Sequence, residues 1–262
     1  FLLQSPSIRP FFIKLLCNPR LSIITQENDL ISEVKFDFHL FKELFENCCS
    51  YYAKDLCFCL EYLKVIEQML WSTHSEIKIL VLHNFVARIL QSSAFLLLSM
   101  HLQKLSGNRD KYSLDRMLRN MLNLAVRFGC PTDLLYISMY YYRTSRYREA
   151  LSVVEMTKEK ISIRHGRCLC PEHQMRYMEA FGGQSWTFKM KHIACKDILF
   201  FHKIRFLDEL ILEQHLFENI SKNDLTISPV ILAHMLECLC CRQTDSNGAH
   251  EAVEALEFLV RN

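Results

Sequence analysis

Glycine and proline are scarce in this sequence, with six of each among 262 residues. An all-β sandwich or barrel needs many tight turns, and tight turns depend on these two residues. The shortage therefore excludes a turn-rich β architecture and favours a mainly helical chain. Half of the residues are hydrophobic, which excludes general disorder and is enough to fill a core of domain size.

A hydrophobic run long enough to cross a bilayer is also missing. The most apolar stretch, residues 77–102, is interrupted by Lys78, His83, Asn84, Arg88 and Gln91. We interpret this stretch as a buried helix and expect no contact with a membrane.

The twelve cysteines do not have the pattern of a disulfide scaffold, because they lie within apolar helical patterns of a chain large enough to build a core. Vicinal pairs such as Cys48-Cys49 and Cys240-Cys241 would point about 100° apart on a helix, which makes a bridge between them difficult. We expect reduced thiols in a cytoplasmic protein. The chain begins at Phe1 without the basic start of a signal peptide, so we also expect it to be part of a longer protein.

The net charge is only +2, but its distribution is uneven. Residues 101–205 carry 19 basic and 9 acidic side chains, whereas residues 206–262 carry 3 and 10. Such a basic segment could bind nucleic acid, or it could pair with the acidic segment of the same chain.

Hydrophobic residues recur at intervals of three and four along most of the chain, which is the spacing of a helix face. This spacing predicts helices over residues 7–17, 38–52, 51–71, 74–104 and 110–128.

Residues 131–164 have the spacing of a tetratricopeptide hairpin. The first helix would carry Leu134, Ile137 and Tyr141, and the second Ala150 and Val154. Tyr141 and Ala150 have the offset of nine found in that repeat, where a small alanine lets the two helices approach closely. Ser138 occupies the position where glycine is usual.

A second hairpin is predicted from residues 229–241 and 248–260. We therefore expect an all-α fold, an array of antiparallel helical hairpins that forms a tetratricopeptide-like α-α superhelix. Residues 1–105 would form a region of long buried helices and residues 106–262 the hairpin array, packed together as one continuous unit.

No motif predicts catalysis, a cofactor or a metal site. His165, Cys168, Cys170 and His173 fall within nine residues, which is too close for the usual two-plus-two arrangement around zinc. Gly182 to Ser185 is similar to the Gly-Ser entry of nucleotidyltransferases, but the two carboxylates one residue apart that would hold Mg²⁺ do not follow. The nearest acidic pair, Asp208-Glu209, is adjacent and would diverge on a helix.

Six basic residues form the candidate binding surface, with Trp186 and Phe188 available to stack on bases. They are Arg143, Arg146, Arg148, Lys189, Lys191 and Lys196. Pairing of these residues with the acidic segment is the structural alternative.

Four stretches together resemble one protein family. They are Leu3–Pro19 (LQSPSIRPFFIKLLCNP), Gly182–Lys191 (GGQSWTFKMK), Asp208–Gln214 (DELILEQ) and Ile227–Cys240 (ISPVILAHMLECLC). The chain is similar over nearly its whole length to the C-terminal helical region of molluscan, especially bivalve, Mab-type (male-abnormal) proteins, relatives of cyclic GMP-AMP synthase.

The resemblance implies a helix-rich tail that follows a nucleotidyltransferase core in an innate immune sensor. No catalytic residue carries over, because this chain lacks the family's Gly-Ser and paired-carboxylate motif. It implies a non-catalytic protein-interaction or scaffold module whose partner is another protein or the nucleotidyltransferase core itself. The alternatives are a nucleic-acid-binding helical domain that uses the basic segment, and an enzyme fragment whose other half supplies the active site.

Overall fold

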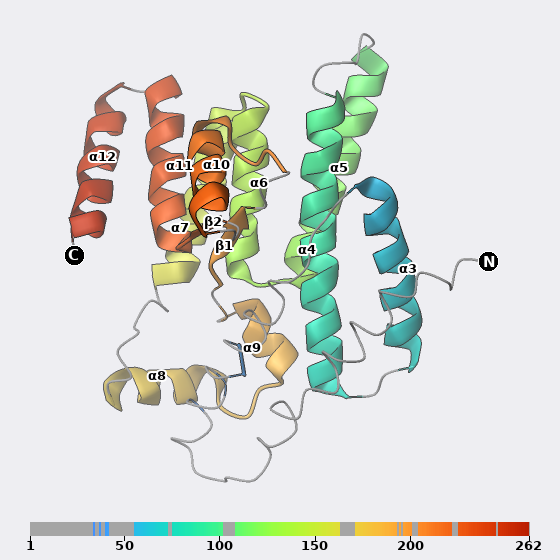
Figure 1. Ribbon diagram of the computed structural model, residues 1–262. Coiled ribbons are helices and arrows are strands. Elements are labelled where there is room, and N and C mark those ends of the chain that lie inside the picture. Colours follow the sequence, from blue (N-terminus) through green and yellow to red (C-terminus); the bar gives the residue numbers. More distant parts are fainter. Residues whose placement is uncertain are drawn as a thin grey trace.

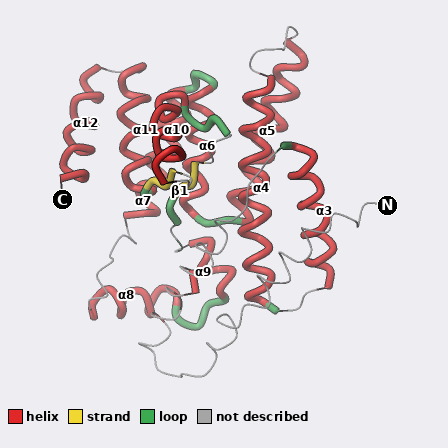
Figure 2. Tube along the Cα trace, in the orientation of Figure 1, coloured by secondary structure: helices red, strands yellow, loops and turns green. Residues whose placement is uncertain are grey.

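A computed structural model shows a chain that is mostly helical (Figures 1 and 2). It describes residues 34, 37, 40, 41, 55–72, 75–101, 108–162, 171–192, 194, 196–200, 204–221, 225–244 and 246–261. The prediction of a helical chain is confirmed for this part. The predicted helix over 7–17 and most of the one over 38–52 lie outside the described residues.

The helices and strands follow in this order. They are α3 (Leu56–Ser72), α4 (Glu76–His101), α5 (Asn108–Phe128), α6 (Leu134–Arg143), α7 (Tyr147–Ser162), α8 (Pro171–Phe181), α9 (Trp186–His192), β1 (Ile198–Phe200), α10 (Ile211–Ser221), β2 (Leu225–Ile227), α11 (Pro229–Thr244) and α12 (Ser246–Arg261). Short 3₁₀ turns at Pro131–Asp133 and Asp208–Leu210 lead into α6 and α10.

Helices that are consecutive in the sequence pack in pairs: α3 on α4, α4 on α5, α6 on α7 and α11 on α12. A long-range contact between α7 and α11 joins the two predicted hairpins side by side (Figure 1). The expected division between residues 105 and 106 falls between α4 and α5, which pack on each other, and one cluster of buried side chains runs from Phe41 to Leu236.

The α6–α7 hairpin has the close contact that its sequence predicts. Leu134, Ile137, Ala150 and Val154 are buried, and Tyr141 is half-buried. The Ser138 hydroxyl donates a hydrogen bond of 3.1 Å to the carbonyl of Ala150. The serine thus links the two helices at the position where the repeat pattern usually has glycine.

A short β-ribbon between α9 and α11 was not predicted. β1 and β2 are antiparallel, and Leu199 lies opposite Thr226 in the register. Three-residue strands are too short to show an alternating pattern in the sequence.

Residues Glu76–Met100 of α4 are numerous and apolar enough to span a bilayer. However, 83% of the most apolar 18-residue stretch of this helix is buried inside the fold. In the described part of the chain it is therefore the central core helix, in contact with α3, α5 and α9.

Replacing Ala150 by leucine should force α6 and α7 apart, because Ala150 is fully buried against Ser138. Overpacking of a core contact costs about 1–3 kcal/mol, so we expect the free energy of unfolding in urea to fall by that amount. Glu149→Leu is the matched control, since Glu149 is the exposed neighbour on α7. Equal stability of the two variants would contradict the close contact.

Candidate functional site

The six predicted basic residues do not form one surface. Arg143, at the end of α6, donates to the carbonyl of Arg205 and lies 3.9 Å from Asp208, and its side chain is only 7% exposed. Burial lowers the pKa of Arg143, and the Asp208 carboxylate partly offsets this effect. Next to it the Tyr142 hydroxyl donates to Glu209, so the adjacent acids of the 3₁₀ turn hold the end of α6.

Arg146 joins the α6–α7 turn to α5. Its Nη2 donates to Asp115 Oδ1 at 2.8 Å, and its guanidinium lies 4.6 Å from the centre of the Tyr141 ring. The Tyr140 hydroxyl donates to the same carboxylate. Burial and this hydrogen bond raise the pKa of Tyr140. Arg146 is therefore mainly a structural residue.

Lys189 is buried, so its predicted place on an exposed surface is wrong. It is 1% exposed, and its Nζ lies 2.6 Å from Asp37 Oδ2. Tyr177 and Trp186 also donate to Asp37, at 2.9 and 3.0 Å. Three donors around one fully buried carboxylate attach α8 and α9 to the N-terminal part of the chain.

Lys196 is also buried, for a similar reason. It is 4% exposed, and its Nζ lies 2.7 Å from Asp133 Oδ1 and 3.4 Å from the side-chain oxygen of Asn84. The other oxygen of Asp133 accepts a hydrogen bond of 2.7 Å from the backbone N–H of Cys130. A fully buried ion pair of this kind cannot contact the phosphates of a ligand at the surface.

Only Arg148 on α7 and Lys191 on α9 are exposed among the six. The sequence could not show this, because the acidic partners of the others are far away in the chain. Asp37 is 152 residues from Lys189, and no local spacing links the two.

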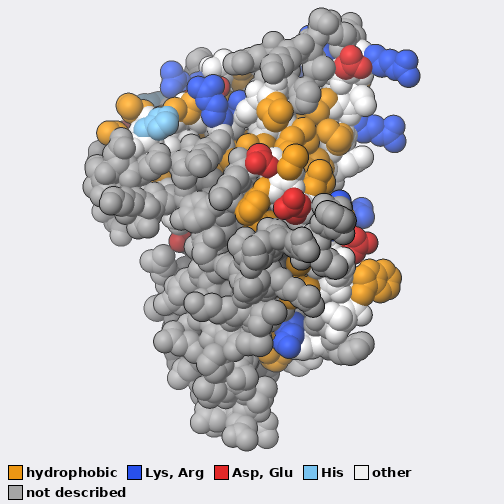
Figure 3. Space-filling view, turned by 45° about the vertical axis from the view of Figure 1, so that its right-hand side comes forward, with side chains coloured by type: hydrophobic (Ala, Val, Ile, Leu, Met, Phe, Trp, Pro, Cys, Tyr) orange, Lys and Arg blue, Asp and Glu red, His pale blue; other side chains and the backbone are white. Residues whose placement is uncertain are grey.

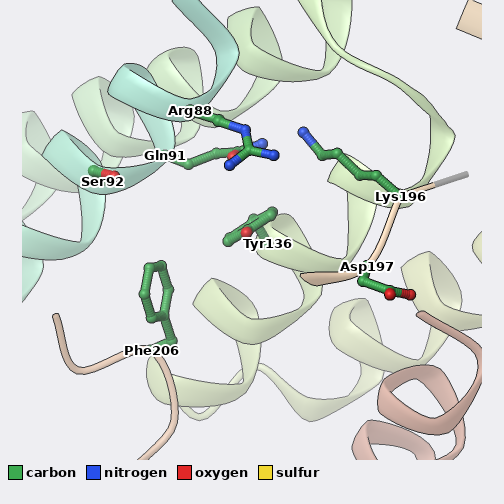
Figure 4. Close-up of a pocket in the computed structure, with 7 residues that line it drawn as sticks. All are labelled: Arg88, Gln91, Ser92, Tyr136, Lys196, Asp197 and Phe206. Atoms are coloured by element: carbon green, nitrogen blue, oxygen red, sulfur yellow. The ribbon is translucent and has the colours of Figure 1, made fainter. Parts of the chain in front are cut away.

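A buried polar face on α4 is the feature that the sequence analysis missed. Asn84, Arg88, Gln91 and Ser92 follow the i, i+4, i+7, i+8 spacing of one helix face, and each is at most 6% exposed. Arg88 and Lys196 point toward each other above Tyr136, and Phe206 lies below them (Figure 4). In the sequence these residues look like interruptions of an apolar run, although their helical spacing was visible.

The cavity between these side chains measures about 10 Å³, near the minimum for a single water molecule. The Nε2 of Gln91 and the Oγ of Ser92 line it without a hydrogen-bond partner among the described residues. The arrangement can hold one small polar species, and it is too small for a nucleotide or a metabolite.

Part of the residues weighed as catalytic or metal-binding lie in the described structure. Gly182 and Gly183 form the turn between α8 and α9, where Gly183 has a φ of +69°, and the Ser185 hydroxyl accepts a hydrogen bond from the N–H of Phe188 in the first turn of α9. His165, Cys168 and Cys170 lie outside the described residues. Within the described part, no group of three or more histidine, cysteine or acidic side chains could hold a metal ion.

The outer side of α5 carries an open groove of about 340 Å³. It is lined by Ser113, Arg116, Met117, Asn120, Met121 and Leu124. Figure 3 looks toward the side of the molecule where α3, α4 and α5 lie, and shows hydrophobic side chains gathered near Lys and Arg side chains. This groove can accept an apolar side chain, and Arg116 places a positive charge in its lining.

Replacing Lys196 by methionine should leave the buried Asp133 carboxylate without its cation. Removing one partner of a buried pair costs about 3–5 kcal/mol, so we expect a large loss in the free energy of unfolding, measured in urea. Lys191→Met is the control, because Lys191 is exposed on the neighbouring helix. Equal free energies of unfolding for the two variants would show that the Lys196–Asp133 ion pair contributes little to stability.

No family model, curated protein or solved structure matches this chain. We therefore infer its function from the geometry of the described residues.

Proposed function

We propose that this chain is a non-catalytic helical protein-interaction module, the counterpart of the C-terminal region of the Mab-type relatives of cyclic GMP-AMP synthase. In this proposal the helix pairs form a tetratricopeptide-like superhelical array that acts as a cytoplasmic scaffold in innate immune sensing. The observation that carries it is the solvent-facing side of α5, which combines an apolar groove with a row of exposed arginines.

The two sides of α5 differ sharply. Leu118, Leu122 and Ala125 are at most 1% exposed and face the core, whereas Met117 and Leu124 are each 42% exposed on the other side. Exposed apolar side chains at a groove often mark an interaction site.

A basic edge runs along the groove. Arg109, Arg116 and Arg127 are exposed and, at 100° per residue, fall within about 20° of one another around the helix axis. The ion pairs among the described residues involve none of these three arginines. The acid of the first turn, Asp110, lies about 100° around the helix axis from Arg109. A basic edge beside apolar side chains suits an acidic amphipathic helix, which would contribute both kinds of contact.

Nucleic-acid binding is the second candidate, supported by the same three arginines together with Arg148 and Lys191. Phosphate contacts release counterions, so affinity falls as the salt concentration rises. In a plot of log affinity against log salt concentration, each phosphate contact with duplex DNA would make the slope more negative by about 0.9. Fluorescence anisotropy with labelled duplex DNA and RNA at several salt concentrations measures this slope. Absence of binding at low salt would remove this candidate.

A photo-crosslinking amino acid at Asn120 tests the interaction module, because Asn120 lines the groove. In the full-length protein in its own cells we expect a crosslink to one protein, or to the nucleotidyltransferase core, that is lost when Arg116 is changed to glutamate. The same amino acid at Glu149 on α7 is the control. A crosslink only to nucleic acid, or none, would contradict the proposal.

A further inference from the structure

The buried polar face of α4 has more hydrogen-bond donors than the described residues accept. Lys196 has three N–H donors on Nζ but two acceptors within reach in the described part of the chain, Asp133 Oδ1 at 2.7 Å and the side-chain oxygen of Asn84 at 3.4 Å. The Nε2 of Gln91 and the Oγ of Ser92 line the adjacent cavity without a hydrogen-bond partner among the described residues. Buried donors are nearly always satisfied, so the surplus indicates a bound species that accepts hydrogen bonds.

The charges around the cavity favour an anion over a water molecule. Arg88 and Lys196 are at most 6% exposed and point toward each other across the cavity (Figure 4). Two cations that face each other inside a protein repel, and a negative charge between them lowers this energy. A water molecule would bring two further donors into a site that already has a surplus of them, whereas an anion brings only acceptors.

The nearby carboxylates do not occupy this position. Asp133 pairs with Lys196 but is not among the residues that line the cavity. Asp197 does line it, but its side chain is exposed and points away from both cations in Figure 4. The space between Arg88 and Lys196 is therefore open to an anion from solution.

The size of the cavity restricts the anion to a single atom. About 10 Å³ is the room that one water molecule needs. A sulfate or a phosphate, with four oxygens around its central atom, is too large for this space. Chloride and bromide are only slightly larger than a water molecule, and chloride is the common halide in biological solutions.

We propose that this cavity binds a chloride ion, with hydrogen bonds from Lys196, Arg88 and Gln91 and with the Ser92 hydroxyl as a further donor. Hydrogen bonds from cationic donors to an anion are among the strong ones in proteins. The ion joins α4 to the segment before β1 and so stabilises the place where Lys196 enters the core. This site is separate from the α5 groove and goes beyond the proposed function.

Unfolding of the purified chain in urea, with sodium chloride replacing sodium gluconate at constant ionic strength, tests the site. Constant ionic strength keeps the screening of surface charges fixed, and gluconate is too large for the cavity. A ligand that binds only the folded chain raises the ratio of folded to unfolded molecules, by about tenfold at ten times its dissociation constant. We expect a rise of this saturable form with chloride and with bromide.

Gln91→Glu places a carboxylate beside the two cations and removes the need for an ion. We expect this variant to fold and to lose the dependence of its stability on chloride, because the new carboxylate supplies the negative charge. Gln68→Glu is the matched control, since Gln68 is exposed on α3. It should keep the chloride dependence of the unaltered chain, and it also reports any general effect of these salts on unfolding.

A crystal of the unaltered chain grown with sodium bromide locates the ion without any variant. Anomalous scattering at the bromine absorption edge should give a peak between Arg88 and Lys196, within hydrogen-bond distance of Gln91 Nε2.

Three outcomes would overturn the inference: equal stability in chloride and gluconate, equal chloride dependence in Gln91→Glu and the unaltered chain, or a cavity that holds an ordered water and no bromide. None of them bears on the proposed function, because the crosslink from Asn120 reports on the α5 groove.

Discussion

Two buried lysine–aspartate pairs hold residues 186–200 in place, and the described structure depends on them. Lys189 binds Asp37 and Lys196 binds Asp133, and each of the four side chains is at most 4% exposed. Removing such charges from water is costly unless the partner and further hydrogen bonds compensate, and both carboxylates do accept additional N–H or O–H donors. The pairs attach α9 and the strand after it to α4, α6 and the N-terminal part of the chain. The polar cavity beside α4 exists because Lys196 enters the core there.

The same pairing explains what remains at the surface. Internal partners remove Lys189 and Lys196 from solvent and hold Arg143 and Arg146 at the joints between helices. Arg109, Arg116 and Arg127 on α5 stay exposed, on the same helix as Met117 and Leu124. A chain of nearly neutral net charge therefore still carries an exposed basic edge beside apolar side chains.

Local periodicity predicted the long helices well, both the amphipathic α5 and the almost entirely buried α4. The predicted spans 74–104 and 110–128 correspond to α4 and α5, and the close approach at Ala150 is present in the α6–α7 hairpin. The β-ribbon was missed because its strands have three residues each. The candidate site was predicted least well: a lysine looks the same in a sequence whether its partner is water or an aspartate 152 residues away.

Composition and periodicity were sufficient for the helical class, the positions of most described helices and the opposite charge of the two segments, because these are properties of neighbouring residues. Which charges are buried and which side of each helix faces solvent depend on contacts between residues far apart in the chain. Lys189 shows the difference. In the sequence, the helix that carries Lys189 was compatible with a binding surface. The fold brings Asp37, Tyr177 and Trp186 around Lys189, and this places the lysine in the core.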